Sequence, residues 1–119
     1  MNIERMLAAI KSHPRFASAG MILCHNGVVR DCARDGRKVS GLRVAVDHDR
    51  LSAILETARS RPGIVDVQVS VVENRNLGVG DDVMFLAVAG DVRENVLAVL
   101  TETLEAIKTT ATTKTEFFV

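Results

Sequence analysis

The sequence predicts an α+β fold, in which a mainly antiparallel sheet carries helices on one face. Residues 64–72 alternate apolar and polar side chains, as in an antiparallel strand with one exposed face, and residues 83–89 are entirely apolar, which indicates a central strand. The predicted elements run in the order helix, strand, strand, helix, strand, strand, helix, followed by a short closing strand. This order does not form a simple series of βαβ crossovers. The chain has 119 residues, the size of one domain, and we expect a single domain over residues 1–119.

The chain begins with one helix and one strand before a charged loop. Residues 2–12 have apolar side chains at three- and four-residue steps, with Asn2 at the N-cap position, and a His-Pro pair ends this helix. Residues 19–25 form a short apolar run, as expected for a buried strand. An Asn-Gly pair then marks a turn or bulge, and residues 28–30 continue the strand beyond it.

Residues 31–41 form a charge-dense loop that is basic on balance and contains an Asp-Gly turn signal. Two interpretations are open, a solvated hairpin tip and a mobile binding loop, because binding residues are disproportionately found on loops. Residues 42–46 predict the next strand. Asp47 or Asp49 then caps a helix that continues to about Arg59.

The predicted strand at 64–72 has two distinct faces. Four valines lie on one face and three polar residues on the other: Val65, Val67, Val69 and Val71 against Asp66, Gln68 and Ser70. Residues 74–82 then form a connecting loop. Its G-x-G favours a turn over a dinucleotide motif, because no third glycine and no helix follow it.

The stretch from Asp91 to Lys114 predicts a long helix followed by a basic segment. Asp91 is expected as the N-cap, with Glu94 completing a capping box. Apolar side chains recur along one stripe: Val92, Val96, Leu97, Leu100, Leu104 and Ile107. Lys108 lies in the last predicted turn, where the helix dipole favours a cation, and the tail after it favours a short strand.

Composition argues against several function classes. Fifteen basic and fifteen acidic residues cancel, so nothing indicates general binding to nucleic acid. No apolar run approaches the roughly 20 residues of a membrane span. The three histidines show no metal-ligand spacing, and we expect neither a metal nor a cofactor. Cys24 and Cys32 fit no zinc pattern and are expected to be incidental thiols in a reducing cytoplasm.

Six cationic side chains are the candidates that are left for chemistry. They are Arg30, Arg37 and Lys38 in the charged loop, and Arg93, Lys108 and Lys114 around the long helix. Arginine suits phosphate and carboxylate through its planar fork, and a lysine can act as a proton donor, a base or an amine nucleophile. Together they would suit a small phosphorylated substrate. The alternative is that these side chains form only a solvated surface.

Several short segments of the sequence occur in a recognisable order. They are Gly20 with Gly27-Val28-Val29-Arg30, Gly36-Arg37-Lys38-Val39 with Leu42, Asn74-Arg75 with Leu77 and Gly80-Asp81, Val92-Arg93, Lys108, and Lys114-Thr115-Glu116. Their shared order resembles the large, catalytic subunit of molybdopterin synthase over about residues 13–118.

This resemblance implies an α/β-hammerhead-like fold and a role in molybdenum cofactor biosynthesis. In that family, sulfur passes from the thiocarboxylated C-terminus of a small ubiquitin-like subunit to cyclic pyranopterin monophosphate. Two large subunits form the centre of a heterotetramer, so a homodimer and a small-subunit partner are expected. Carried over to this chain, Lys108 and Lys114 would be catalytic, and Arg30 and Arg93 would bind the substrate's phosphate or the carrier's carboxyl group. Residues 37 and 38 are expected to help bind the substrate.

Several positions depart from the family's pattern. His25 stands where the family has Phe, and Val92 where it has His. Two threonines replace an aromatic pair before Lys114, the spacing from Lys108 is one residue short, and the sequence ends where family members continue. The alternative is therefore a catalytically inactive homologue that acts as a dimeric binding module for a ubiquitin-like partner. A plain α+β domain with an unrelated role is the third possibility.

Overall fold

The computed structural model describes residues 2–119. The helices are α1 (Ile3–Lys11), α2 (His48–Arg59) and α3 (Arg93–Ala106), with a short 3₁₀ helix η1 (Phe16–Ser18) and a π-helical turn η2 (Ile107–Ala111). The strands are β1 (Met21–Val28), β2 (Val39–Val46), β3 (Ile64–Val71), β4 (Leu77–Gly78), β5 (Asp82–Gly90) and β6 (Thr112–Phe118). Within these residues, no helix is long and apolar enough to cross a membrane.

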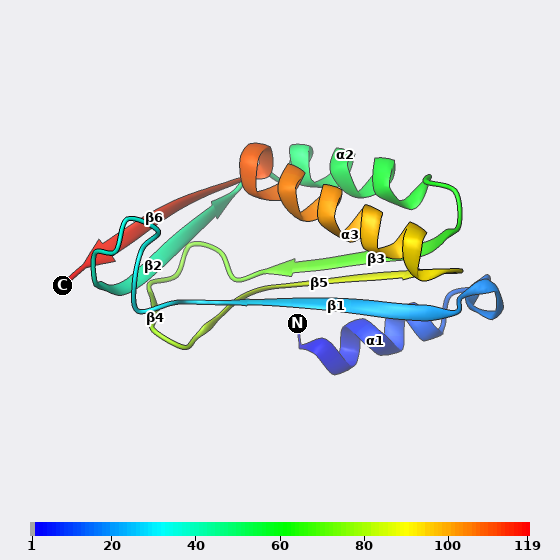
Figure 1. The fold of residues 1–119 in the computed structure, drawn as a ribbon, viewed down its shortest axis with the longest axis horizontal. Coiled ribbons are helices and arrows are strands. Elements are labelled where there is room, and N and C mark those ends of the chain that lie inside the picture. The colour runs from blue at the N-terminus through cyan, green and yellow to red at the C-terminus, as the bar shows by residue number, and fades with distance from the viewer. Residues whose placement is uncertain (1) are drawn as a thin grey trace.

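The strands form two antiparallel sheets, with the orders β1-β5-β3 and β4-β2-β6. Figure 1 shows the two sheets following each other along an elongated molecule of 48 × 25 × 24 Å. The predicted α+β class with antiparallel pairing is confirmed. The apolar strand β5 is central in its sheet, as its sequence predicts, and the closing strand forms as β6.

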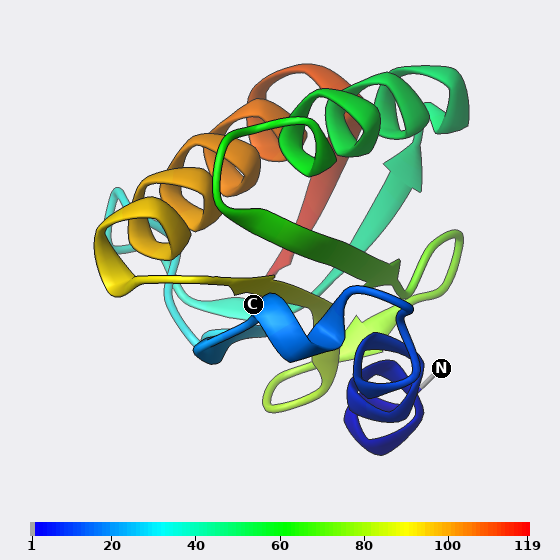
Figure 2. The same cartoon turned by 90° about the vertical axis from the view of Figure 1, so that its right-hand side faces the viewer.

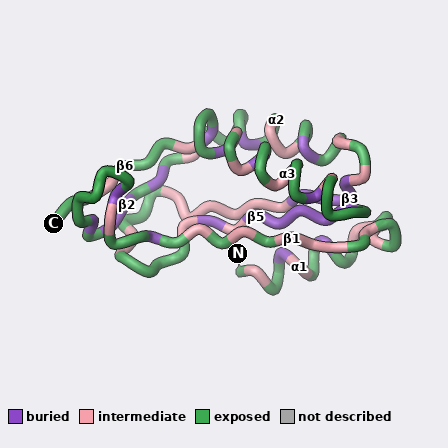
Figure 3. The backbone as a smooth tube through the Cα atoms, viewed as in Figure 1, coloured by how far each residue is buried: buried purple, intermediate pink, exposed green. Residues whose placement is uncertain are grey.

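The first sheet is covered by helices on both faces. Helices α2 and α3 lie on one face, as expected, whereas α1 lies on the other (Figures 1 and 2). The strand β5 presents apolar side chains to both sides, because Leu86 and Val88 pack under α2 and α3 while Ala87 and Ala89 pack against α1. Small alanines let α1 lie close to the sheet, and Met6 fills that contact. Figure 3 shows the buried residues concentrated between these layers.

The start of β3 differs from the predicted alternation. The pairing register with β5 shifts between Ile64 and Asp66, so Val65 packs on the α1 side while Val67 packs under α2 and α3. Asp66 was expected on an exposed face but is only 6% exposed. Its carboxylate lies 3.4 Å from the Arg59 guanidinium and accepts a hydrogen bond from the Val67 amide (2.8 Å). A buried carboxylate is tolerated here because it is paired and hydrogen-bonded.

Helix α3 begins and ends differently from the prediction. Its N-cap is Val92, without a side-chain cap, because the Asp91 carboxylate instead accepts from the Val92 amide (2.6 Å) and the Asn95 amide group (2.9 Å). Leu97, placed on the apolar stripe, is 49% exposed, and the buried face includes Thr103. The buried α3 residues are Val96, Val99 and Thr103.

The α-helix ends at Ala106, two residues before Lys108, which the sequence placed in its last turn. The hydroxyl groups of Thr109 and Thr110 bond the carbonyl oxygens four residues earlier, at 2.8 and 2.6 Å, in the segment where the chain widens into η2. Threonines that bond back in this way favour a bend over a continued helix. The change of structure places Lys108 on a π-helical turn and Lys114 on a strand.

Candidate functional site

A cavity of about 320 Å³ lies where the two sheets meet the π-helical turn. Strands β1, β2, β3, β5 and β6 all contribute to its wall, together with η2 and the loop after β1. Its lining residues are His25, Gly27, Val28, Arg34, Leu42, Val44, Val71, Val83, Met84, Lys108, Thr112 and Lys114. The wall is therefore mostly apolar with a few basic groups, as is common in small-molecule sites.

Lys108 and Lys114 both line this cavity, although they come from different elements. Lys108 leaves the exposed side of η2, while its neighbour Ile107 is fully buried and anchors the turn. Lys114 lies on β6, where it pairs with the buried Val44 of the neighbouring strand β2. The nearest acidic group to Lys114 is Glu116, at a long 3.9 Å, so the lysine is not tied into a close ion pair.

The other four predicted site residues do not line the cavity. Arg30 is exposed because the residue before it, Val29, is buried and directs the alternating chain outward. Arg93 lies in the first turn of α3 and pairs with Glu94 at 3.6 Å in the solvent.

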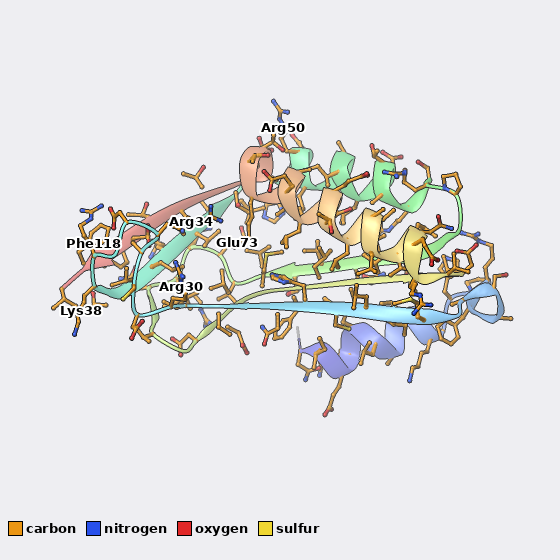
Figure 4. The ribbon with its side chains drawn as sticks, in the orientation of Figure 1. Arg30, Arg34, Lys38, Arg50, Glu73 and Phe118 are labelled. Carbon is orange, nitrogen blue, oxygen red and sulfur yellow. The ribbon has the colours of Figure 1, made fainter. Side chains whose placement is uncertain are left out.

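Arg37 and Lys38 lie at the far end of the second sheet, beside the C-terminus. The Arg37 guanidinium pairs with Asp35 (2.8 Å) and stacks 3.9 Å from the centre of the Phe118 ring. Figure 4 shows Lys38 near Phe118 at this end of the molecule. Arg30, Arg37, Lys38 and Arg93 therefore lie outside the cavity that the two lysines line, because each faces solvent or another partner. Their role in substrate binding stays a prediction.

Arg34 also lines the cavity, and the sequence analysis did not single it out. It lies in the charged loop that was expected to bind ligand, between residues 31 and 41. In the sequence it is only one of three basic residues in that loop, with no spacing that separates it from Arg37 or Lys38. Which basic side chain of the loop reaches the cavity depends on how the loop turns.

His25 is the second residue whose role the sequence left unassigned. Its Nε2 atom is buried and has no hydrogen-bond partner within residues 2–119. Burial lowers the pKa of His25 below its ordinary value, and the positive charge of Lys108 lowers it further. The sequence feature that could have pointed to His25 is that it stands where the family has Phe. At neutral pH the imidazole is therefore uncharged and lies beside a lysine.

The electrostatics of the cavity favour an anionic ligand. Arg34, Lys108 and Lys114 are positively charged, and no carboxylate is among the described lining residues. A low-dielectric wall strengthens the attraction between these cations and a bound anion. Residues 2–119 contain no group of three His, Cys, Asp or Glu side chains placed to hold a metal ion, and Cys24 and Cys32 are both free and outside the cavity.

A second cavity, of about 310 Å³, lies between α2 and α3. Its wall is mainly apolar, with Arg61 and Glu102 joined in an ion pair at its edge. Because that pair neutralises charge locally, this groove lacks the concentration of like charge found in the first cavity. The seam between the sheets is therefore the better candidate for chemistry.

Comparison with known proteins gives a consistent family. The family described as "MoaE protein" matches residues 1–110. No curated protein matches the sequence. Among solved structures, the chain is similar to a molybdopterin synthase from Staphylococcus aureus, with 18% identity, a TM-score of 0.79, and coverage of 100% of this chain and 86% of that one.

Two further structures show the same fold. The molybdopterin cofactor biosynthesis protein E from Burkholderia multivorans has 25% identity and a TM-score of 0.76, with 100% of this chain and 84% of that chain covered. A complex of subunits 1 and 2 of molybdopterin-converting factor from Helicobacter pylori has 16% identity and a TM-score of 0.70, with the same coverage. The resemblance noted in the sequence is confirmed. Because the family match extends over nearly the whole sequence, the chain belongs to the MoaE protein family, and this membership supports a role in molybdenum cofactor biosynthesis.

Proposed function

We propose that the protein is the large subunit of a molybdopterin synthase, which transfers sulfur from a thiocarboxylated carrier to cyclic pyranopterin monophosphate. The observation that carries the proposal is the convergence of Lys108 and Lys114 on one cavity without a lining carboxylate. Both proposed substrates are anionic, so fixed cations in a partly apolar wall would bind them and stabilise charge that develops during the transfer.

The proposed reaction moves one sulfur atom from each carrier. The bond between sulfur and the carrier's acyl carbon breaks, and a carbon–sulfur bond forms on the pterin substrate as a carbon–oxygen bond at the same carbon breaks. The acyl carbon takes oxygen from water and ends as a carboxylate. One proton of that water goes to the oxygen group that leaves the pterin substrate, and the other is released. Lys108 and Lys114 would hold the acyl group and its developing negative charge, and either amine could attack the acyl carbon once it is deprotonated. The uncharged His25 beside Lys108 leaves the number of cations in the pocket at three.

The proposed partner is a small ubiquitin-like subunit whose C-terminal tail reaches the cavity. The related H. pylori structure is described as a complex of two subunits of molybdopterin-converting factor, which supports looking for such a partner here. We also propose a homodimer of this chain, as the family resemblance implies, in the cytoplasm.

A second candidate is a catalytically inactive binding module. His25 and Val92 depart from the family's residues, and Val92 is half-exposed at the start of α3, away from the cavity. In that case the chain would bind the carrier's tail without turnover.

Reconstitution tests the proposal. The protein is mixed with a thiocarboxylated small subunit and cyclic pyranopterin monophosphate, and dithiolene product is measured. Lys108→Ala is expected to lower the rate by about 100-fold or more, the range seen when one charge-stabilising group is removed from an active site. The matched control is Lys11→Ala, which removes the same side chain from α1, outside the cavity, and should leave the rate unchanged. Carrier binding without product would instead favour the binding module.

A further inference from the structure

Arg34 differs from the other basic residues of its loop. It lines the cavity with Lys108 and Lys114, whereas Arg30, Arg37 and Lys38 do not. Its guanidinium forms no ion pair within the part of the chain that the structure describes, while Arg37 is already committed to Asp35. Arg34 is thus the cation of this loop that is placed to meet a ligand in the cavity.

The backbone of the loop is closed by its own hydrogen bonds. The Ala33 amide donates to the Arg37 carbonyl (2.9 Å), and the Gly36 amide donates to the Ala33 carbonyl (3.0 Å). Gly36 has a φ of 91°, a conformation that favours glycine, and it completes the turn. The Ala33 side chain is buried, so the residue just before Arg34 is anchored in the protein. The backbone that carries the Arg34 side chain is therefore ordered before the ligand arrives, which lowers the entropy cost of binding.

The same loop is fastened to the end of β6. Arg37 stacks on the Phe118 ring, and the Val119 amide donates to the Lys38 carbonyl (3.1 Å). Strand β6 also carries Lys114. The C-terminal strand therefore links the position of the loop, and with it Arg34, to the position of a lysine in the same cavity.

The charge of the cavity indicates which anion fits best. Three cations line it, more than the single charge of a carboxylate requires. A cyclic phosphate carries one negative charge, and the monoester that remains when its ring opens carries roughly 1.5 to 2 near neutral pH. We infer that Arg34 is a specificity-determining contact that binds the phosphate group of a small phosphorylated substrate, and that Phe118 is a positioning residue for the Arg34 loop. The identity of the substrate in this inference rests on the proposed function. The choice of Arg34 rests on the lining of the cavity and on the geometry of the loop.

Direct binding tests the inference without any turnover. Inorganic phosphate and, separately, glycylglycine as a carboxylate probe are titrated into the protein, and the chemical shifts of the loop amides are followed by NMR. Arg34→Gln is expected to weaken phosphate binding by about tenfold, the loss typical of one charge-assisted hydrogen-bonded contact, and to change glycylglycine binding less. Arg34→Lys should restore part of the affinity, because it keeps the charge and loses the fork.

The matched control is Arg5→Gln, the same substitution on the exposed side of α1 and outside the cavity, which should leave phosphate affinity within about twofold. Phe118→Leu should weaken phosphate binding by about threefold through a looser loop. If Phe118 acts through Arg34, the double variant Arg34→Gln/Phe118→Leu should bind no more weakly than Arg34→Gln alone. A full additional loss in the double variant would overturn the positioning role.

Four results would overturn the assignment of Arg34. They are no phosphate binding by the unaltered protein, unchanged binding in Arg34→Gln, an equal loss in Arg5→Gln, and a loss confined to glycylglycine. The two proposals fail separately. Arg34-dependent phosphate binding without dithiolene product would contradict only the synthase activity, whereas normal product formation with an unaffected Arg34→Gln would contradict only the inference.

Discussion

The two halves of the molecule are built very differently. The helix-covered half, sheet β1-β5-β3 with its three helices, buries apolar residues on both faces of the sheet, and Leu86 and Val88 are completely inaccessible. The distal sheet, β4-β2-β6, has a small cluster around Leu42 and exposes Phe118 at its end. The difference indicates that one half holds most of the folding free energy, while the other supplies part of the wall of the cavity where the two sheets meet.

The largest expected effect is on the free energy of unfolding, and it is compared by making the same leucine-to-alanine substitution in each half. Leu86→Ala in the helix-covered half should lower the free energy of unfolding by about 2–5 kcal/mol, because a cavity forms under α2 and α3. Leu42→Ala in the distal sheet removes the same atoms from a smaller cluster and should cost less. Urea denaturation of both variants gives the comparison. An equal or greater loss for Leu42→Ala would mean that the distal sheet is part of the main core.

A smaller effect is expected from a single methyl group in the distal sheet. A Cβ at Gly41 would collide with the carbonyl oxygen of Leu77, so Gly41→Ala should separate β4 from β2 and cost about 1–3 kcal/mol. Its pairing partner Gly78 offers the control, because a Cβ there would meet only Asp81 at an ordinary 3.6 Å. Gly78→Ala should therefore stay within about 0.5 kcal/mol. Similar unfolding midpoints for the two variants would contradict this account of the β2–β4 contact.

The smallest effect concerns pH and the seam itself. The pKa of His25 is lowered in the folded protein, so below the unfolded value of about 6.5 the unfolded chain binds this proton more readily. The contribution of His25 to stability is therefore present above that pH and is lost as pH falls through the folded pKa. His25→Phe should flatten this part of the stability curve, measured by thermal unfolding between pH 7.5 and roughly pH 5. An unchanged slope of stability against pH in His25→Phe would contradict the burial of the imidazole that the structure shows.

The sequence predicted the elements of the helix-covered half well, because burial leaves a periodic pattern. The apolar run of β5 marked a central strand, and Asn2 and Asp47 cap the first two helices as expected, accepting backbone amides at 2.9 and 3.1 Å. The errors are at positions where tertiary contacts override the pattern. Asp66 is buried because Arg59 reaches it, and the bulge in β3 moves Val65 to the opposite face.

The sequence by itself determined the class of fold, the antiparallel strands and the family, because periodicity and motif order are local properties of the chain. It also marked the two lysines as candidates. Only the tertiary structure decided which cations share a cavity. Lys108 and Lys114 line the same cavity because the π-helical turn ends α3 and redirects the chain into β6. Arg30 and Arg93, in contrast, are exposed to solvent. Arg34 joins the lysines through the closure of one loop. Convergence of side chains depends on contacts between distant segments, which spacing along the sequence does not encode.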